Sequence, residues 1–358
     1  MLDKTKRYLI VGLGLLGGKY ALELSKAGFH VDGINRSEGH LQYALDHGYI
    51  ASGKTHDFED LVSQADHIIF GLYPTALIDW FKTYGHLIKP GCIFTDVSGV
   101  KTGLVEPVQA MCPEGVEFIA SHPMAGRETS SVEHAAEVSF APANFIITPT
   151  EKNTPEAVQW AKELAEVLGF RHICTLTVQE HDKMIGYVSQ LCHAIAVSLM
   201  NANDNTHLAE YTGDSFRDLT RIAKINENLW SELFFLNKEN LIAEIDQFSA
   251  SLEGLKCALV ENDETELKRL FVQSTARRRL FDKNGRSAEM KLEQMPRYPL
   301  LCGFTPLQRM ENLEQALGCG PLYIKRDDLT PRGAWAATRR ASWNFCWETR
   351  WPGARTRW

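Results

Sequence analysis

A histidine and a glutamate lie close together in residues 121–128, which have the sequence Ser-His-Pro-Met-Ala-Gly-Arg-Glu. Pro123 lacks an N–H for a strand ladder and Gly126 permits positive φ, so we predict that no regular element runs through this segment. It follows the strand-like run 116–120, and His122 is therefore expected just past the carboxyl end of a strand, where open α/β sheets bind ligands. A neutral imidazole there could accept a proton. A loop histidine in solvent is the alternative.

The first strand-like run of the chain ends in a glycine-rich loop of the pattern G-x-G-x-x-G, and a helical segment follows. In a dinucleotide site the first glycine permits a tight turn, the second lets the backbone approach the pyrophosphate, and the third lets helix and strand pack closely. The amino end of the helix attracts the anion. We therefore predict a nucleotide site here, with a purely structural turn as the alternative. The candidate cofactor-binding residues are Gly12, Gly14, Leu15, Leu16 and Gly17.

The second strand-like run, residues 29–34, ends in Asn35 and Arg36. Asn35 occupies the position at which an Asp or Glu usually binds the ribose 2′-hydroxyl group. Asn does not repel a 2′-phosphate, and Arg36 beside it can pair with one. We therefore predict NADP rather than NAD as the cofactor. The alternative is that Arg36 is a solvated surface residue and that either cofactor is used.

Further strand-like runs alternate with helical segments, which indicates an α/β fold with a Rossmann-type, doubly wound parallel sheet in residues 1–177. The runs lie at residues 67–72, 92–96 and 116–120, and later strands are expected at 145–147 and 171–174 around a helix over about 155–168. Three strand ends would bring Tyr73, the Ser98 loop with Lys101, and His122 to one edge of the sheet. Tyr73 is therefore a further cofactor-binding candidate.

The pattern becomes helical after residue 177, and we expect an all-α domain over residues 178–285. Its apolar faces favour a homodimer formed through this domain. Taken alone, His193 is most simply a buried core histidine, and Arg217, Asp218 and Arg221 are an ordinary solvated helix face. The two arginines are four residues apart and share a face, so a substrate carboxylate could bind there.

The composition excludes several classes of function. The chain has 358 residues and a formal net charge of -7, so it lacks the basic footprint of a nucleic-acid-binding protein. We find no signal-peptide pattern and no apolar run long enough to span a membrane. Eight cysteines without C-x-x-C pairs argue against a zinc site and a disulfide scaffold. The sequence therefore predicts a cytoplasmic protein with reduced thiols and no metal.

Residues from about 6 to 281 resemble the prephenate/arogenate dehydrogenase family of tyrosine biosynthesis. The matching segments occur in the family's order along the chain. They are the glycine-rich loop, residues 95–101 (Thr-Asp-Val-Ser-Gly-Val-Lys), residues 121–128, Ser189-x-Leu191-x-His193, residues 220–223 (Thr-Arg-Ile-Ala), and Leu229-Trp230.

The resemblance implies a reaction and a set of site residues. It implies oxidative decarboxylation of prephenate to 4-hydroxyphenylpyruvate with hydride transfer to NAD(P), or of arogenate to tyrosine as the alternative. His122 would accept the ring hydroxyl proton, the loop of Ser98 and Gly99 would contact both His122 and the nicotinamide, and His193 would line the pocket. Arg221 would bind a substrate carboxylate. The remaining substrate-binding candidates are Arg217, Glu128 and Asp218, the last two as an ionic gate, and Trp230.

The chain departs from the family pattern in three places, one of which is residues 225–228 (Ile-Asn-Glu-Asn), where the family usually has a segment of the Ser-Asp-Pro type. The usual Gly-Ser order is Ser98-Gly99 here, and residues 189–193 lack one histidine and the proline of the family's Ser-His-Leu-Pro-His signature. These differences leave the choice between prephenate and arogenate open. A β-hydroxyacid-type dehydrogenase with Lys183 as acid/base is an alternative that would leave residues 121–128 and Arg221 without a role. A non-catalytic nucleotide-sensing protein is a further alternative.

The last part of the chain, residues 286–358, has a different character. From about residue 290 it resembles the start of a pyridoxal-phosphate enzyme of the D-cysteine desulfhydrase type. The segment that holds the Schiff-base lysine in that family is replaced by residues 333–343, which lack a lysine. We therefore disfavour a pyridoxal-phosphate lyase and interpret the tail as a frameshifted fusion that is poorly ordered.

Overall fold

A sheet of six parallel strands forms the amino-terminal part of the protein, with the strand order β3-β2-β1-β4-β5-β6. The computed structural model describes residues 2–126, 129, 131–281, 307–317 and 323–325. The strands are β1 (Arg7–Val11), β2 (His30–Ile34), β3 (Ser52–Lys54), β4 (His67–Phe70), β5 (Ile93–Asp96) and β6 (Glu117–Phe118). The order reverses between β1 and β4, so the prediction of a doubly wound Rossmann-type sheet is confirmed.

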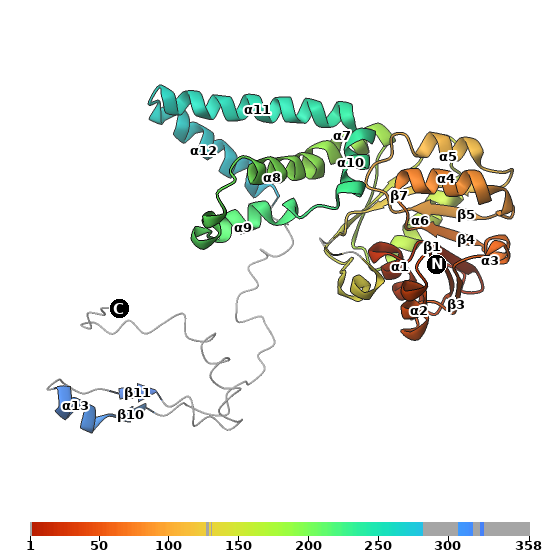
Figure 1. The fold of residues 1–358 in the computed structure, drawn as a ribbon, viewed down its shortest axis with the longest axis horizontal. Coiled ribbons are helices and arrows are strands. Elements are labelled where there is room, and N and C mark those ends of the chain that lie inside the picture. The colour runs from red at the N-terminus through yellow and green to blue at the C-terminus, as the bar shows by residue number, and fades with distance from the viewer. Residues whose placement is uncertain (1, 127–128, 130, 282–306, 318–322, 326–358) are drawn as a thin grey trace. The chain divides into compact units, whose positions relative to one another are not determined.

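Both faces of this sheet are buried because successive residues of a strand point to opposite sides. Tyr8 and Ile10 of β1 belong to one core, and Leu9 and Val11 to the other. The helices α1 (Leu15–Lys26), α2 (Glu38–Asp46) and α6 (Pro155–Val167) pack on the first core. The helices α3 (Glu59–Gln64), α4 (Pro74–Tyr84) and α5 (Val105–Met111) pack on the second core, with α4 and α5 side by side in Figure 1.

A second sheet corrects the prediction for residues 121–128. The strand β7 (Ala120–Pro123) pairs antiparallel with β8 (Asn144–Thr148), which pairs parallel with β9 (His172–Thr175). His122 thus lies within a strand opposite Ile146, and the expectation of no regular element there was wrong. Pro123 is tolerated because β7 is an edge strand of this sheet and the proline nitrogen needs no ladder partner. The later strands were placed correctly, but the β7–β8 pair is not parallel.

The helical part begins with a stretch that a π-helical segment interrupts. The capping box of Thr177 and Glu180 starts α7 (Val178–Ile185), and the π segment η3 (Gly186–Leu191) joins it to α8 (Cys192–Asn201). The helices that follow are α9 (Asp214–Thr220), α10 (Glu227–Leu236), α11 (Lys238–Val260) and α12 (Glu264–Arg279). The short 3-10 turns of the helical part are η4 (Thr206–Tyr211) and η5 (Arg221–Ala223), and those that precede it in the chain are η1 (Gly85–Leu87) and η2 (Val132–Glu137). Figure 1 shows α8 and α11 in this helical part.

Residues 1–267 and 268–358 form two separate units. In the second unit, β10 (Leu307–Arg309) pairs antiparallel with β11 (Tyr323–Lys325), and α13 (Glu311–Leu317) lies between them in sequence. The predicted frameshift and the replaced lysine segment lie outside the described residues. The domain boundaries at residues 177 and 285 stay predictions. No helix in the described ranges is long and apolar enough to cross a membrane.

Candidate active site

His122 lies where β7 passes the carboxyl end of β5. An ideal Cβ atom on Gly99, in the loop after β5, would be 3.7 Å from His122 Nε2 and 3.6 Å from Leu233 Cδ1 of α10. The Nε2 side of the imidazole therefore borders the loop after β5, at the edge of the sheet where doubly wound folds bind ligands. The side chain of His122 is half-buried. The predicted neighbourhood of His122 and the Ser98–Gly99 loop is thus present, although His122 lies in a strand.

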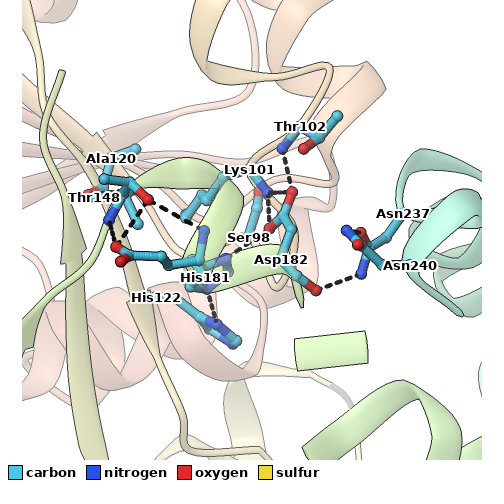
Figure 2. Close-up of polar contacts among 12 residues, drawn as sticks. Ser98, Lys101, Thr102, Ala120, His122, Thr148, His181, Asp182, Asn237 and Asn240 are labelled. Atoms are coloured by element: carbon cyan, nitrogen blue, oxygen red, sulfur yellow. Dashed lines mark hydrogen bonds and ion pairs between the residues drawn. The ribbon is translucent and has the colours of Figure 1, made fainter. Parts of the chain in front are cut away.

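The other side of the His122 ring contacts a histidine that the sequence analysis missed. His122 Nδ1 is 2.9 Å from His181 Nε2, and His181 Nδ1 is 2.6 Å from Asp182 Oδ1 (Figure 2). Both His181 and Asp182 are fully buried on α7. Asp182 also accepts backbone hydrogen bonds from Lys101 at 3.0 Å and from Thr102 at 2.6 Å. A chain of hydrogen bonds thus joins the candidate base to the loop after β5.

A buried ion pair holds that loop in place. Lys101 Nζ is 2.7 Å from Asp96 Oδ2 and donates to the backbone carbonyl of Ser121 at 2.6 Å. Asp96 also accepts from the backbone N–H groups of Ser98 and Ser121. A buried pair of charges persists only when both are well paired and hydrogen-bonded, as they are here. The ion pair therefore fixes the end of β5, the loop after it and the start of β7 relative to one another.

The two histidines are held in their neutral forms. Burial lowers the pKa of His122 well below its ordinary value, and the nearby His181 and Lys101 lower it further. Burial also lowers the pKa of His181, although the hydrogen bond to Asp182 opposes that shift. A neutral imidazole can accept a proton, so His122 can act as a general base at neutral pH.

The glycine-rich loop between β1 and α1 fits a dinucleotide. Gly12 has a φ of +95°, and an ideal Cβ on Gly17 would lie 1.9 Å from the carbonyl oxygen of Gly12, so both positions need glycine. Gly14 has open space where a side chain would be, and no side chain caps the amino end of α1. An anion can therefore approach the free N–H groups there. Asn35 accepts a hydrogen bond from the backbone of Leu13 at 3.0 Å, which ties β2 to this loop.

Two further cofactor candidates lie at strand ends. Arg36 is exposed after β2, which agrees both with a contact to a 2′-phosphate and with a solvated surface residue. Tyr73 is exposed after β4, and its hydroxyl group accepts from Asn226 Nδ2 at 3.1 Å. The backbone N–H of Thr75 donates to Glu232 Oε1 at 2.6 Å. The β4–α4 loop therefore contacts the segment that begins α10.

His193 and Trp230 form the second cluster of candidate residues. Their rings stack with centroids 3.6 Å apart, and His193 Nδ1 bonds the backbone carbonyl of Ser189 at 2.9 Å. Burial lowers the pKa of His193. These contacts agree both with a residue that lines a pocket and with a hydrogen-bonded core histidine.

The charged substrate-binding candidates that the structure describes are all exposed. Arg217 is exposed and pairs with Asp214 at 3.1 Å, and Asp218 is exposed on the same helix. Arg221 is exposed on η5, which packs against α8. Glu128 lies outside the described residues, so the predicted ionic gate with Asp218 stays a prediction. Lys183, the base of the alternative dehydrogenase reaction, is exposed.

A network of side-chain amides links α7 to α11 beneath the site. The Asn237 amide donates to the backbone carbonyl of Asp182 at 2.8 Å and to Gln190 Oε1 at 2.7 Å. Gln190 in turn donates to the backbone carbonyl of Leu233 at 2.9 Å. A signal for these residues was present in the sequence, since His181 and Asp182 interrupt an otherwise apolar helix face near Ile185. A single helix does not reveal which partner such a pair meets.

Two family models match the chain. One is described as the nucleotide-binding domain of prephenate dehydrogenase and matches residues 20–174, and the other as its dimerization domain and matches residues 177–273. The prephenate dehydrogenase of Lactococcus lactis subsp. cremoris is 30% identical over 278 residues, or 74% of this chain and 75% of the relative. That of Bacillus subtilis is 27% identical over 271 residues, or 74% and 72% of the two chains.

A solved structure is similar over nearly its whole length. It is prephenate dehydrogenase from A. aeolicus in complex with hydroxyphenyl propionate and NAD+, and it superposes with a TM-score of 0.71 at 28% identity. The similarity covers 77% of this chain and 98% of that chain. The shared fold therefore spans both the Rossmann-type sheet and the helices that follow it.

Proposed function

Because this chain belongs to the prephenate dehydrogenase family, we propose that His122 is the group that accepts the hydroxyl proton of its substrate. The chain is an NAD(P)-dependent prephenate/arogenate dehydrogenase of tyrosine biosynthesis. Prephenate is the proposed substrate, since the relatives described above are prephenate dehydrogenases. Arogenate differs only in carrying an amino group in place of the side-chain keto group, and it is the alternative.

The observation on which the proposed role rests is the neutral His122 ring with its Nε2 atom beside Gly99 at the carboxyl end of β5. The bound nicotinamide supplies the hydride acceptor. His122 takes the proton of the hydroxyl group on the carbon that loses hydride. Loss of CO2 then makes the ring aromatic. The ring oxygen of the product is again a hydroxyl group, so the same imidazole can return the proton. The driving force lies in the substrate, and the protein supplies orientation and proton transfer.

We propose that Gly12, Gly14 and Gly17, with the backbone of Leu15 and Leu16, hold the pyrophosphate of the cofactor. The open space at Gly14 and the uncapped amino end of α1 support this assignment. NADP is the preferred cofactor in this proposal. Arg36 is exposed and could pair with the 2′-phosphate, and the neutral Asn35 does not repel it. Tyr73 and Ser98 would face the bound cofactor from the ends of β4 and β5.

We propose that the substrate lies between His122 and the stacked pair of His193 and Trp230. The aromatic stack would border the substrate ring, and Arg221 would bind a carboxylate. Arg217, Asp218 and Glu128 complete the proposed set of substrate-binding residues. An aromatic face and the two guanidinium groups suit a small cyclic dianion.

A homodimer formed through α11 is proposed as the assembly, in a protein that we place in the cytoplasm. Four exposed apolar residues of α11 lie on one face: Ile245, Phe248, Leu252 and Leu259. The match to a dimerization domain supports this proposal at the level of the family. Light scattering should give twice the mass of one chain, and Leu252→Glu should shift the protein toward the monomer. Gln247→Glu, on the opposite face of α11, is the matched control and should leave the dimer intact.

The proposed role of His122 is tested by steady-state assays with prephenate and arogenate, each with NADP and NAD. His122→Asn should lower kcat by at least about 100-fold, because general base catalysis is typically worth 10²–10⁴-fold. Its cofactor affinity, measured by fluorescence titration, should be unchanged. His86→Asn replaces an exposed histidine on η1 and should retain full activity. Full activity of the His122 variant would contradict the proposal.

A further inference from the structure

We propose that His181 and Asp182 are positioning residues that hold His122 in the tautomer whose Nε2 atom is free to accept the substrate proton. This inference rests on the proposed role of His122. It adds two residues of α7 to the machinery, and neither touches the substrate in this proposal. Their hydrogen bonds determine which nitrogen of the His122 ring bears hydrogen before the substrate binds.

The argument begins at Asp182. Burial alone would raise the pKa of this carboxyl group, but hydrogen bonds from His181 and Thr102 hold it below its ordinary value. An ionised carboxylate can only accept hydrogen bonds. The 2.6 Å contact between His181 Nδ1 and Asp182 Oδ1 is therefore a bond in which the imidazole N–H donates. The hydrogen on His181 Nδ1 is thus assigned from the hydrogen-bond partners of the ring.

The second step passes from His181 to His122. A neutral imidazole carries one N–H, so a His181 that donates through Nδ1 has a bare Nε2 atom. That atom can only accept, and the group 2.9 Å away is His122 Nδ1. His122 must then donate through Nδ1, which leaves its own Nε2 without hydrogen. This bare nitrogen borders Gly99 at the edge of the sheet.

The charges around the two rings act in opposite directions. The groups that face them are Asp182 from α7, Asp96 from the end of β5 and Lys101 from the loop after it. Two carboxylates and one ammonium group leave one negative charge in excess while both histidines are neutral. The carboxylates raise the pKa of His181, whereas His181 and Lys101 lower that of His122. Burial also opposes a positive charge on His122, so its imidazole is neutral when the substrate binds.

Asp182→Asn tests the direction of these hydrogen bonds, because the substitution should exchange the donor and the acceptor in each of them. An asparagine carbonyl at the Oδ2 position would keep the bond from the Thr102 backbone at 2.6 Å and the longer bond from Lys101 at 3.3 Å, since an NH2 group at that position would face the N–H of Thr102. The NH2 group would then donate to His181 Nδ1. His181 would carry its hydrogen on Nε2, and His122 would be forced into the tautomer with an N–H at Nε2.

The first measurement is the tautomer itself. The ¹⁵N chemical shifts of histidine-labelled protein distinguish a protonated ring nitrogen from a bare one, and the His122 signals are assigned by their loss in His122→Asn. We expect hydrogen on Nδ1 of His122 in the unaltered protein and on Nε2 in Asp182→Asn. Hydrogen on Nε2 in the unaltered protein would overturn the inference, even if His122 proves to be the base.

The second measurement is kinetic. Asp182→Asn should lower kcat by at least about 100-fold, the scale of a lost general base, while KM and cofactor affinity are retained. Asp32→Asn is the matched control, since Asp32 is also buried and hydrogen-bonded, to Arg7, His30 and Ser52, on β2. It should lower the melting temperature and leave kcat unchanged.

A second substitution separates positioning from folding. Gln at residue 181 can accept from His122 Nδ1 through Oε1, so His181→Gln should retain more activity than His181→Leu, which cannot. Equal loss in the two variants, or a kcat of Asp182→Asn equal to that of Asp32→Asn, would overturn the inference. Failure of His122→Asn to lose activity would instead contradict the proposed function.

Discussion

An ideal Cβ atom on Gly17 would lie 1.9 Å from the carbonyl oxygen of Gly12. No real side chain fits at that distance, so the start of α1 can pack on the end of β1 only if residue 17 is glycine. Gly14, between them, has open space at the same position and a φ of −85°, which any residue can adopt. The three glycines of one motif are thus required for two different reasons. Gly12 and Gly17 are required by the fold, and Gly14 lets a ligand approach the backbone.

A matched pair of substitutions separates these two reasons. Gly17→Ala should destabilise the fold by about 1–3 kcal/mol or more, the cost of overpacking a tight contact, with a corresponding fall in melting temperature. Gly14→Ala should leave the melting temperature nearly unchanged and weaken dinucleotide binding at least about tenfold, or ~1.4 kcal/mol. Calorimetry and cofactor titration measure both quantities on the same samples. Equal effects of the two substitutions on stability would contradict the assignment.

The Rossmann-type sheet could be predicted because its strands are continuous apolar runs that end in glycine or polar residues. Buried on both faces, such runs differ clearly from their surroundings. The three-residue strand β3 has no such pattern and was not found. Residues 120–123 were misjudged because Pro123 is compatible with an edge strand, and the edge is defined by pairing with β8, which lies later in the chain. Local sequence does not contain that information.

The candidate site was predicted in part for the same reason. His122, Gly99 and the glycine-rich loop follow strand ends, and strand ends meet at one edge of a parallel sheet. His181 lies 59 residues after His122 on a helix of another part of the fold, and its hydrogen bond depends on how α7 packs beside the loop after β5. The stacking of His193 on Trp230 likewise joins α8 to α10. Such contacts follow from tertiary packing, which spacing along the chain does not reveal.

Cofactor preference should depend on Arg36. Replacing it with Ala removes a charge-assisted hydrogen bond to a 2′-phosphate, worth about 1.5–3 kcal/mol when well formed. Because this side chain is exposed, we expect the lower end, roughly a tenfold rise in Kd for NADP. The Kd for NAD should not change. Isothermal titration with both dinucleotides measures the ratio, and an equal loss for the two would show that Arg36 does not read the 2′-phosphate.

Substrate binding should depend on Arg221. If its guanidinium group binds a carboxylate in both the ground state and the transition state, Arg221→Ala raises KM by about 10–100-fold and changes kcat little. Arg171→Ala removes another exposed arginine, before β9, and serves as the control. Initial rates over a range of prephenate concentrations separate the two constants. A pure loss of kcat with unchanged KM would contradict the proposed role.

The pH dependence of kcat/KM should reflect the low pKa of His122. Burial, His181 and Lys101 lower this pKa, so the neutral and active form persists below pH 6.5, the ordinary value for histidine. We therefore expect the rate to stay level as pH falls to 6.5 and to decline only at lower pH, as His122 becomes protonated. Rates are measured in a constant-ionic-strength buffer series, and return to neutral pH checks reversibility. A decline centred above pH 6.5 would contradict the assignment.

A second buried histidine, His67, should affect the stability of the fold and not the rate of the reaction. His67 of β4 stacks on Trp160 and packs at a tilted angle against Tyr8, and burial lowers its pKa to about 4. The unfolded chain has the ordinary pKa of about 6.5, so between these values it binds more protons than the native protein does. Stability contributed by neutral His67 is therefore complete above pH 6.5 and is lost as pH falls toward 4, by about 3 kcal/mol in total. His67→Phe keeps an aromatic ring in the stack and cannot titrate. The melting temperature of the native chain should consequently fall relative to that of the variant across this window, whereas a constant difference would show that His67 does not titrate on unfolding.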